Sequence, residues 1–376
     1  MIRLSFARVR FVPTALATLW LATALPVAAQ DWTLGPFVRP AGINPVILPD
    51  PTSTFIDPMS GQRLAWEASD TFNPAAIRRK NKVYVLYRAE DRSGQGIGKR
   101  TSRLGMAVSK DGLRMKRRKT PVFYPADDSQ KEFEWPGGCE DPRIAVTPEG
   151  LYVMFYTQWN RDVPRLAVAT SKNLTTWTKH GPAFRQAYGG KFKNLASKSA
   201  SIVTKLEKGR LVITRVNGQY LMYWGERFMN IATSTDLVNW TPSVDAKGEL
   251  TAALLTRPNH FDSDLTECGP PALLTAKGIL VLYNGKNKPG AGRDTTYTAN
   301  TYAAGQVLFD AKEPGRVIAR LDKPFFVPTE PFEKSGQYPA GTVFVEGLVY
   351  HKDKWFLYYG CADSRVAVAV YDPATR

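Results

Sequence analysis

Leu151-Tyr-Val-Met-Phe-Tyr156 is a run of aromatic and β-branched residues, and Ser171-Lys-Asn-Leu-Thr-Thr-Trp177 follows it after a short interval. The first run is typical of a buried β-strand. In the second, Ser and Asn ahead of the Trp indicate a tight turn between two strands, with the Trp packed on the outer hairpin. Together the two stretches predict one unit of an antiparallel sheet.

Both signals recur along the chain. The turn marker returns at Ser109 and Ser234, so its three copies start about 62 residues apart. The strand signal returns with starts 60 to 76 residues apart, at Val83–Tyr87, Leu151–Tyr156, Leu211–Ile213, Ile279–Tyr283 and Trp355–Tyr359. A period of this length, repeated five times, predicts four-stranded blades and an all-β, five-bladed β-propeller. A two-sheet sandwich followed by another domain is the alternative, while the missing helical period disfavours a TIM barrel.

The first 29 residues have the features of a secretory signal peptide. Three arginines precede an apolar run at Phe11–Leu25, and Val27-Ala-Ala29 supplies small residues for cleavage after Ala29. The run is short for a membrane span, so no membrane insertion is expected after signal removal. We therefore expect a periplasmic or secreted protein, with residues 30–376 as a single propeller domain.

Composition narrows the class of partner. The chain has 376 residues, 43% of them hydrophobic, and its 50 Lys and Arg against 34 Asp and Glu give a net charge of +16. No nucleic-acid recognition motif accompanies this charge, so nucleic acid is not an expected partner, whereas attraction to an acidic surface or polysaccharide stays open. Cys139, Cys268 and Cys361 and three scattered His show no metal-ligand spacing. We expect no metal, no cofactor and small buried thiols.

Charged and amide side chains recur at the ends of the strands, where a plain sheet core would have none. Carboxylates accept protons from sugar hydroxyls and Arg donates in a fixed fork, so a convergent set predicts a polyhydroxylated ligand. Cleavage of a glycoside needs one carboxyl to protonate the leaving oxygen and another to activate water or attack. Candidates for these two roles are Asp141, Glu226 and Glu267.

Each candidate also has a purely structural interpretation. Asp141 could cap a turn and pair with Arg143, and Glu226 could form a surface ion pair with Arg227. Glu267 could satisfy backbone donors in a buried loop. For Asp363, holding a closing turn is as good an interpretation as binding a ligand.

Gly138-Cys-Glu-Asp-Pro-Arg143 resembles a motif of glycoside hydrolase family 130, the β-mannoside phosphorylases and β-1,2-mannosidases. The resemblance continues over nearly the whole chain, through Phe72-Asn-Pro-Ala75, Tyr87-Arg-Ala-Glu-Asp91, Gly269-Pro-Pro271, Tyr283-Asn-Gly285 and Tyr358-Tyr-Gly-Cys-Ala-Asp363. It implies a five-bladed β-propeller with Asp141 as a general acid that acts through a mannose hydroxyl. It also implies a mannose subsite shaped by Asn73, Arg88, Asp91, Arg143 and Asp363.

One departure from the family pattern bears on the reaction. Phosphorylases of the family carry a His in a Tyr-His-Gly turn, where this chain has Asn284, so one phosphate ligand is missing and Asn284 is expected to line the site instead. Lys198 and Arg215 stand near the remaining phosphate-ligand positions. Glu226 and Glu267 are similar to the extra glutamates of the branch that hydrolyses β-1,2-mannosides.

The sequence therefore predicts an exported, inverting hydrolase that releases mannose from β-1,2-linked mannosides, with Asp141 as acid and Glu226 and Glu267 activating water. The alternatives are a β-mannoside phosphorylase that uses Lys198 and Arg215, and a non-catalytic mannan-binding propeller.

Overall fold

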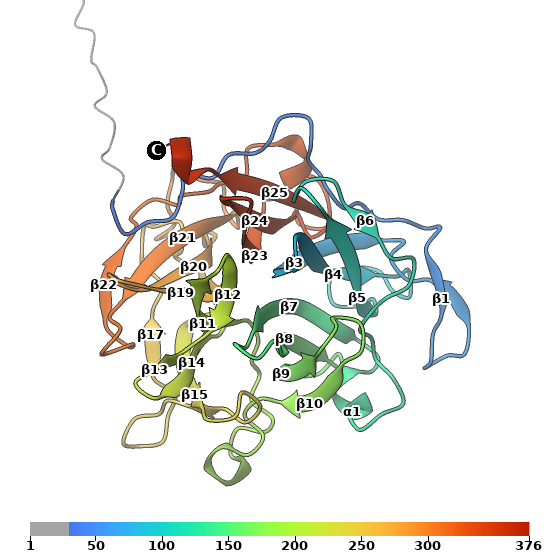
Figure 1. The fold of residues 1–376 in the computed structure, drawn as a ribbon, viewed down its shortest axis with the longest axis horizontal. Coiled ribbons are helices and arrows are strands. Elements are labelled where there is room, and N and C mark those ends of the chain that lie inside the picture. Colours follow the sequence, from blue (N-terminus) through green and yellow to red (C-terminus); the bar gives the residue numbers. More distant parts are fainter. Residues whose placement is uncertain (1–29, 376) are drawn as a thin grey trace, which may run out of the picture.

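The regular structure consists almost entirely of β-strands (Figure 1). The computed structural model describes residues 30–375, and within that range the single α-helix is the one-turn α1 (Lys131–Glu134). The predicted all-β class is confirmed. The predicted signal peptide, with its cleavage after Ala29, lies outside the described residues. Between residues 30 and 375 no helix is long and apolar enough to cross a membrane.

Antiparallel pairing sorts most strands into five consecutive groups, which lie around a common centre (Figure 1). The first group contains β3 (Asp70–Arg79), β4 (Lys82–Glu90), β5 (Ser102–Ser109) and β6 (Lys116–Arg117). The second contains β7 (Gly138–Val146), β8 (Tyr152–Trp159), β9 (Pro164–Ser171) and β10 (Thr178–Pro182). The third contains β11 (Ala200–Glu207), β12 (Arg210–Ile213), β13 (Arg215–Val216), β14 (Gln219–Trp224), β15 (Met229–Ser234), β16 (Thr241–Pro242) and β17 (Ala252–Leu254).

The fourth group contains β18 (Leu265–Cys268), β19 (Ala272–Thr275), β20 (Gly278–Lys286), β21 (Tyr302–Phe309) and β22 (Val317–Arg320). The fifth contains β23 (Val343–His351), β24 (Lys354–Cys361) and β25 (Arg365–Tyr371). A separate hairpin joins β1 (Thr54–Ile56) to β2 (Arg63–Ala65).

Neighbouring groups are held together by apolar clusters between them. One cluster joins the first two groups through residues such as Leu86 and Met154, and another joins the fifth group to the first through Val85 and Phe356. The other three clusters fill the remaining contacts between consecutive groups. Because burial of apolar surface is the main favourable term in folding, no single group is expected to be stable alone.

The repeated turn markers fold as predicted. In the second group the Ser171 hydroxyl accepts from the Leu174 amide, and the Trp177 indole donates to the Leu174 carbonyl at 3.2 Å. The same bonds recur in the third group, where Trp240 is buried and donates to the Leu237 carbonyl at 3.1 Å. Both Trp side chains therefore have a packing role.

A buried tyrosine marks the second long strand of four groups, and its hydroxyl donates to a buried carboxylate. The four pairs are Tyr87 with Glu67, Tyr156 with Glu134, Tyr283 with Asp262, and Tyr359 with Glu333, at 2.6 to 2.8 Å. Each carboxylate is also paired with a cation, namely Arg117, Lys179, Arg257 with Arg320, and Arg39. The repeat seen in the sequence thus extends to a buried polar layer in which each carboxylate has a hydroxyl donor and a cation, while one oxygen of Glu67 has no hydrogen-bond partner.

The segment before β1 completes the fifth group. Val38 and Ile47 pair with β25, and the Asn44 side chain bonds both the amide and the carbonyl of Val368, at 2.9 and 2.8 Å. Residues from the two ends of the described chain therefore share one sheet. This pairing covers the edge of β25, which would otherwise present unpaired backbone groups.

Candidate functional site

Three innermost strands are interrupted by a β-bulge at the same level. The bulges fall between Phe72 and Pro74 in β3, between Glu140 and Arg143 in β7, and between Val345 and Gly347 in β23. A bulge leaves a residue unpaired and redirects its side chain. Asn73 and Asp141, which occupy two of them, have φ angles of 46° and 48°, and a proline without an amide donor follows each. A left-handed backbone conformation is uncommon in residues other than glycine, and it concentrates at functional sites.

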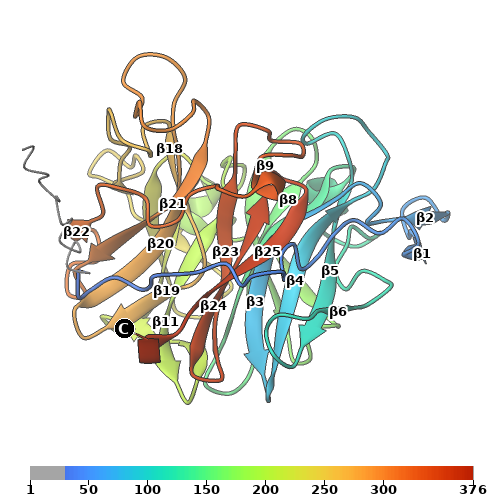
Figure 2. The same cartoon turned by 90° about the horizontal axis from the view of Figure 1, so that it is seen from above.

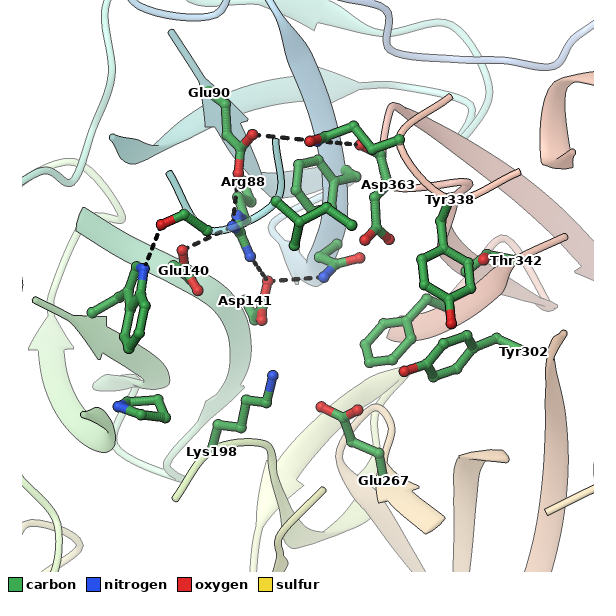
Figure 3. A pocket seen from close by; sticks show the side chains of 18 residues that line it. Arg88, Glu90, Glu140, Asp141, Lys198, Glu267, Tyr302, Tyr338, Thr342 and Asp363 are labelled. Carbon is green, nitrogen blue, oxygen red and sulfur yellow. Dashed lines mark hydrogen bonds and ion pairs between the residues drawn. The ribbon is translucent and has the colours of Figure 1, made fainter. Parts of the chain in front are cut away.

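A cavity of about 290 Å³ opens where these bulges meet (Figure 3). Its walls come from strands of the first, second, fourth and fifth groups and from the segments that follow β4, β10, β22 and β24. The lining residues are Phe72, Asn73, Arg88, Glu90, Ile97, Gly98, Glu140, Asp141, Trp159, Pro164, Lys198, Glu267, Tyr302, Gln337, Tyr338, Thr342, Phe344 and Asp363.

Arg88 is the centre of one wall. Its guanidinium contacts three carboxylates, with Glu90 at 2.7 Å, Glu140 at 2.8 Å and Asp141 at 3.1 Å. The Ser102 hydroxyl accepts from Arg88 Nε and donates to Glu140. Arg100 also pairs with Glu90, at 3.3 Å, so two cations face three buried carboxylates and one negative charge is left over. The structure can lower that charge by keeping a proton on one of the carboxyls.

Asp141 is the carboxyl of this wall that favours ionisation. Burial opposes its charge, but Arg88, Lys198 and Arg143 together with a hydrogen bond from Asn73 outweigh burial and lower the pKa of Asp141. The Asn73 amide donates to Asp141 Oδ1 at 2.8 Å. Asp141 is therefore fixed in direction by two donors, and its second oxygen is left for a ligand.

Lys198, Glu226 and Glu267 form the opposite part of the site. Lys198 Nζ pairs with Glu226 at 2.9 Å and points into the cavity, and Glu267 points in from another wall (Figure 3). Burial disfavours the Lys198 charge, yet Glu267, Glu226 and Asp141 raise its pKa above the ordinary value. Glu267 is buried in β18, whereas the Glu226 side chain is 47% exposed at the rim and does not line the cavity.

Three carboxyls of the site have pKa values near neutrality. Burial raises the pKa of Glu140 to about 7 against the opposing charge of Arg88, and it raises that of Glu267 to about 7 against the charge of Lys198. The pKa of Asp363 is also raised to about 7, mainly by burial. Groups that titrate near pH 7 can both donate and accept a proton, as general acid–base catalysis requires.

Aromatic side chains complete the cavity. Phe72, Trp159, Tyr302, Tyr338 and Phe344 line it, and the rings of Tyr302 and Tyr338 meet edge to face with centroids 5.3 Å apart. Flat apolar faces beside carboxylates and cations suit a ring that carries both hydroxyls and C–H groups. Among the described residues, no three His, Cys, Asp or Glu side chains are grouped to hold a metal ion.

Six of the residues predicted from the sequence line this cavity, namely Asn73, Arg88, Asp141, Lys198, Glu267 and Asp363. Glu226 reaches it through its ion pair with Lys198. Asp363 takes a left-handed backbone conformation in the turn after β24, so it both holds that turn and faces the cavity.

Arg143, predicted to shape the mannose subsite, lies behind the cavity wall. It is buried and pairs with Glu346 in β23 at 2.8 Å, and it donates to the carbonyls of Asp141 and Cys268. Its guanidinium therefore connects the strand of Asp141 with the strand of Glu267. Its contacts are those of a positioning residue.

Asp91, Asn284 and Arg215 also do not line the cavity. Asp91 accepts from Arg103 at 2.7 Å. Because successive side chains at a strand end point to opposite sides, Glu90 faces the cavity and Asp91, one residue further on, does not. Asn284 exchanges two hydrogen bonds with the backbone of Val345 and so joins β20 to β23. Arg215 is exposed on β13 and donates to nearby carbonyls, so this structure does not place it as a phosphate ligand.

Several lining residues were not predicted. Glu90 and Glu140 each stand next to a residue that was predicted. The motifs therefore indicated the right positions along the chain but not which of two adjacent residues faces the cavity. Gln337 and Tyr338 come from a loop without a recognisable motif. Gln337 donates to the Asp363 carbonyl at 3.0 Å, which shows how that loop is attached to the site.

Comparisons with known proteins agree on one family. The model of glycoside hydrolase family 130, described as β-1,4-mannooligosaccharide phosphorylase, matches residues 57–374. A 1,2-β-oligomannan phosphorylase from Thermoanaerobacter sp. is 34% identical over 82% of this chain and 91% of its own. A glycosyl hydrolase structure from Bacteroides ovatus is 63% identical, with a TM-score of 0.90 over 92% of this chain and 96% of its own.

A further solved structure is also 63% identical, with a TM-score of 0.91 over 92% of this chain and 96% of its own. It is described in terms of a family of mannoside phosphorylases that contains glycoside hydrolases targeting β-1,2 mannosidic linkages in Candida mannan.

The raised carboxyl pKa values predict that the protein without ligand loses stability as the pH rises. Glu140 and Glu267 keep their protons in the folded chain up to about pH 7, but ordinary glutamates ionise near 4.5. The folded state binds more protons in this window, so the free energy of unfolding falls between about pH 4.5 and about 7. Asp141, with a lowered pKa, acts in the other direction only below its ordinary value of 3.8.

Thermal unfolding midpoints measured across this window in the wild type, Glu140→Gln and Glu207→Gln check this expectation. We expect a shallower fall in Glu140→Gln, because an amide cannot ionise, and an unchanged slope in the exposed Glu207→Gln. A midpoint that rises with pH, equally in all three proteins, would contradict the expectation.

Proposed function

The chain belongs to glycoside hydrolase family 130, and we propose that it is an exported, inverting hydrolase that releases mannose from β-1,2-linked mannosides. The observation that carries the proposal is the Glu226–Lys198 ion pair beside Glu267, in a cavity that also holds Asp141. The 63% identity to a structure described for hydrolases of β-1,2 mannosidic linkages supports the same reaction.

Asp141 is proposed as the general acid. The Asn73 amide and Arg88 orient its carboxyl, which would pass a proton through a hydroxyl of the bound mannose to the leaving oxygen. The pKa of Asp141 is lowered in the protein without ligand. To act as an acid, Asp141 therefore has to gain a proton when sugar binds and displaces water from the cavity. Glu140 shares Arg88 with Asp141 and has a pKa of about 7, so the two carboxyls together retain a proton near neutral pH.

Glu267, with Glu226, is proposed to activate water. Ser199 donates to Glu267 and fixes its direction, and Lys198 lies between Glu267 and Glu226. Ionised Glu267 would take a proton from water as the water attacks the anomeric carbon, while Asp141 protonates the leaving oxygen from the other side. An inverting enzyme needs these two carboxyls about 6.5–9.5 Å apart, which leaves room for the water.

The second candidate reaction is phosphorolysis, because Lys198 is a cation in the cavity and the curated relatives are named as phosphorylases. The contacts of Lys198 argue against it. Glu226 pairs with this cation and places a negative charge where phosphate would bind, and Arg215 lies elsewhere. A purely mannan-binding protein would need no carboxyl near Lys198 with a pKa of about 7.

We also propose that the five strand groups are the blades of a five-bladed β-propeller, with the cavity on its axis. Residues 30–376 would then be one catalytic domain, and residues 1–29 a signal peptide. Sequencing the amino terminus of protein recovered from the periplasm or medium tests the proposed signal peptide, and Gln30 is the expected first residue.

Product analysis with β-1,2-mannobiose, in the presence and absence of phosphate, distinguishes the two reactions. A hydrolase releases mannose at the same rate in both conditions, and proton NMR would show the α-anomer first if the mechanism inverts. Mannose 1-phosphate formed only with phosphate would instead establish a phosphorylase. A phosphorylase from the family serves as the positive control for that product.

Asp141→Asn and Glu267→Gln are each expected to lower kcat by at least about a hundredfold, as removal of a general acid or base does. Because Glu267 must be ionised to act as base, the wild-type kcat/KM should rise as pH increases through about 7, and Glu267→Gln should lose this rise. Glu226→Gln is expected to reduce activity in the same way.

The matched control is Glu207→Gln, because Glu207 has the same exposure as Glu226 and pairs with Lys205 at 3.0 Å outside the cavity. Full activity in Asp141→Asn or Glu267→Gln, with normal folding by circular dichroism, would show that the proposed roles are wrong.

A further inference from the structure

A second hollow lies beside the catalytic cavity, on the far side of Glu226. It has a volume of about 290 Å³, and its lining includes Arg227, Phe228, Ser263, Asp264 and Lys288. Glu226 pairs with Lys198 of the catalytic cavity, and the next two residues line the hollow. The turn at residues 225–228 therefore borders both spaces.

Strand β18 runs from one space to the other. Its amides at Thr266 and Cys268 donate to the carbonyls of Arg227 and Gly225, each at 3.2 Å, which fixes the turn against the strand. Glu267 of β18 faces the catalytic cavity, and Asp264, immediately before the strand, lines the hollow. Three residues of extended chain span about 10 Å, so the two spaces are near neighbours.

A second connection runs along the opposite side. Lys286 pairs with Asp264 at 3.0 Å and lies over the ring of Tyr302, with Nζ 5.8 Å from the centroid. Tyr302 lines the catalytic cavity, so one lysine contacts the walls of both spaces. A ligand that extends out of the catalytic cavity past Glu226 would meet the hollow next.

One wall of the hollow comes from the loop between β20 and β21, which contributes Lys288 and Gly292 and stands above β18 in Figure 2. Asn287 is fully buried, and its amide group donates to the carbonyls of Asp294, Tyr297 and Thr298. Ser263 donates to Asn287, and the amide of Lys288 donates to Ser263. These bonds hold the loop in place before any ligand binds.

The chemistry of the lining suits an uncharged sugar unit. Arg227 and Lys288 can donate to hydroxyls, Ser263 and Asp264 can accept, and the Phe228 ring is 37% exposed, so part of it is available to stack on a pyranose. Asp264 already has a cation, because Lys286 pairs with it. With Asp264 paired to Lys286, the lining has a net positive charge from Arg227 and Lys288, and both cations can donate to sugar hydroxyls.

We propose that this hollow is a subsite for a sugar unit beyond the cleaved bond, so that the enzyme favours β-1,2-mannosides of three or more units over the disaccharide. The inference rests on the proposed function. The non-reducing mannose would occupy the catalytic cavity, the chain would pass Glu226, and the third unit would contact Arg227 and Phe228.

Initial rates with β-1,2-mannobiose and β-1,2-mannotriose test the subsite in the wild type, Arg227→Ala, Phe228→Ala and Phe228→Leu. We expect kcat/KM for the trisaccharide to fall about tenfold in Arg227→Ala and Phe228→Ala, as loss of one such contact does, with less than a twofold change for the disaccharide. Phe228→Leu guards against misfolding, and Arg114→Ala, at an exposed turn of the first group, is the matched arginine control.

Equal losses on both substrates, or none on either, would overturn the subsite. If the wild type turns over neither substrate, the proposed function fails, and calorimetry then decides the subsite separately. Trisaccharide that binds more tightly than disaccharide, with the difference abolished in Phe228→Ala, supports it, and equal affinities overturn it.

Discussion

The arrangement of the site depends on the buried guanidinium of Arg143. It contacts Glu346 in β23, the Asp141 carbonyl in β7 and the Cys268 carbonyl in β18, so one side chain fixes three strands of three groups. Removing one partner of a buried pair typically costs about 3–5 kcal/mol, because the other charge is left unpaired. This connection helps to fix Asp141 and Glu267 relative to one another, which an apolar side chain could not do by hydrogen bonding.

The second constraint is the charge balance around the cavity. Glu90, Glu140, Asp141, Glu267 and Asp363 face two cations, Arg88 and Lys198. Burial makes an unpaired negative charge costly, so Glu140, Glu267 and Asp363 can hold protons near neutral pH, while hydrogen bonds and nearby cations keep Asp141 ionised. In the protein without ligand the proposed acid, Asp141, is therefore ionised, and the proposed base, Glu267, titrates near pH 7, so sugar binding has to redistribute protons among these carboxyls before cleavage.

Much of the fold and part of the site could be predicted from the sequence. Strand composition and the Ser-x-Asp turns indicated the repeat, and residues at strand ends indicated the cavity, including Asn73, Asp141 and Lys198. The choice between adjacent residues failed where a bulge or strand end decides which side chain faces inwards, as with Glu90 against Asp91. Asn284 was misplaced because it stabilises a neighbouring strand, a long-range contact that no local pattern encodes.

The pairing of Asn44 with Val368 joins residues 324 positions apart, and it sets an order for folding. Val38 and Ile47 pair with β25, so the segment before β1 has no partner until β25 has been synthesised. The fifth group cannot be completed before that point. Contacts of such long sequence separation form late and slow the overall rate. The nascent chain therefore stays open along one side until β25 is available to pair with Val38 and Ile47.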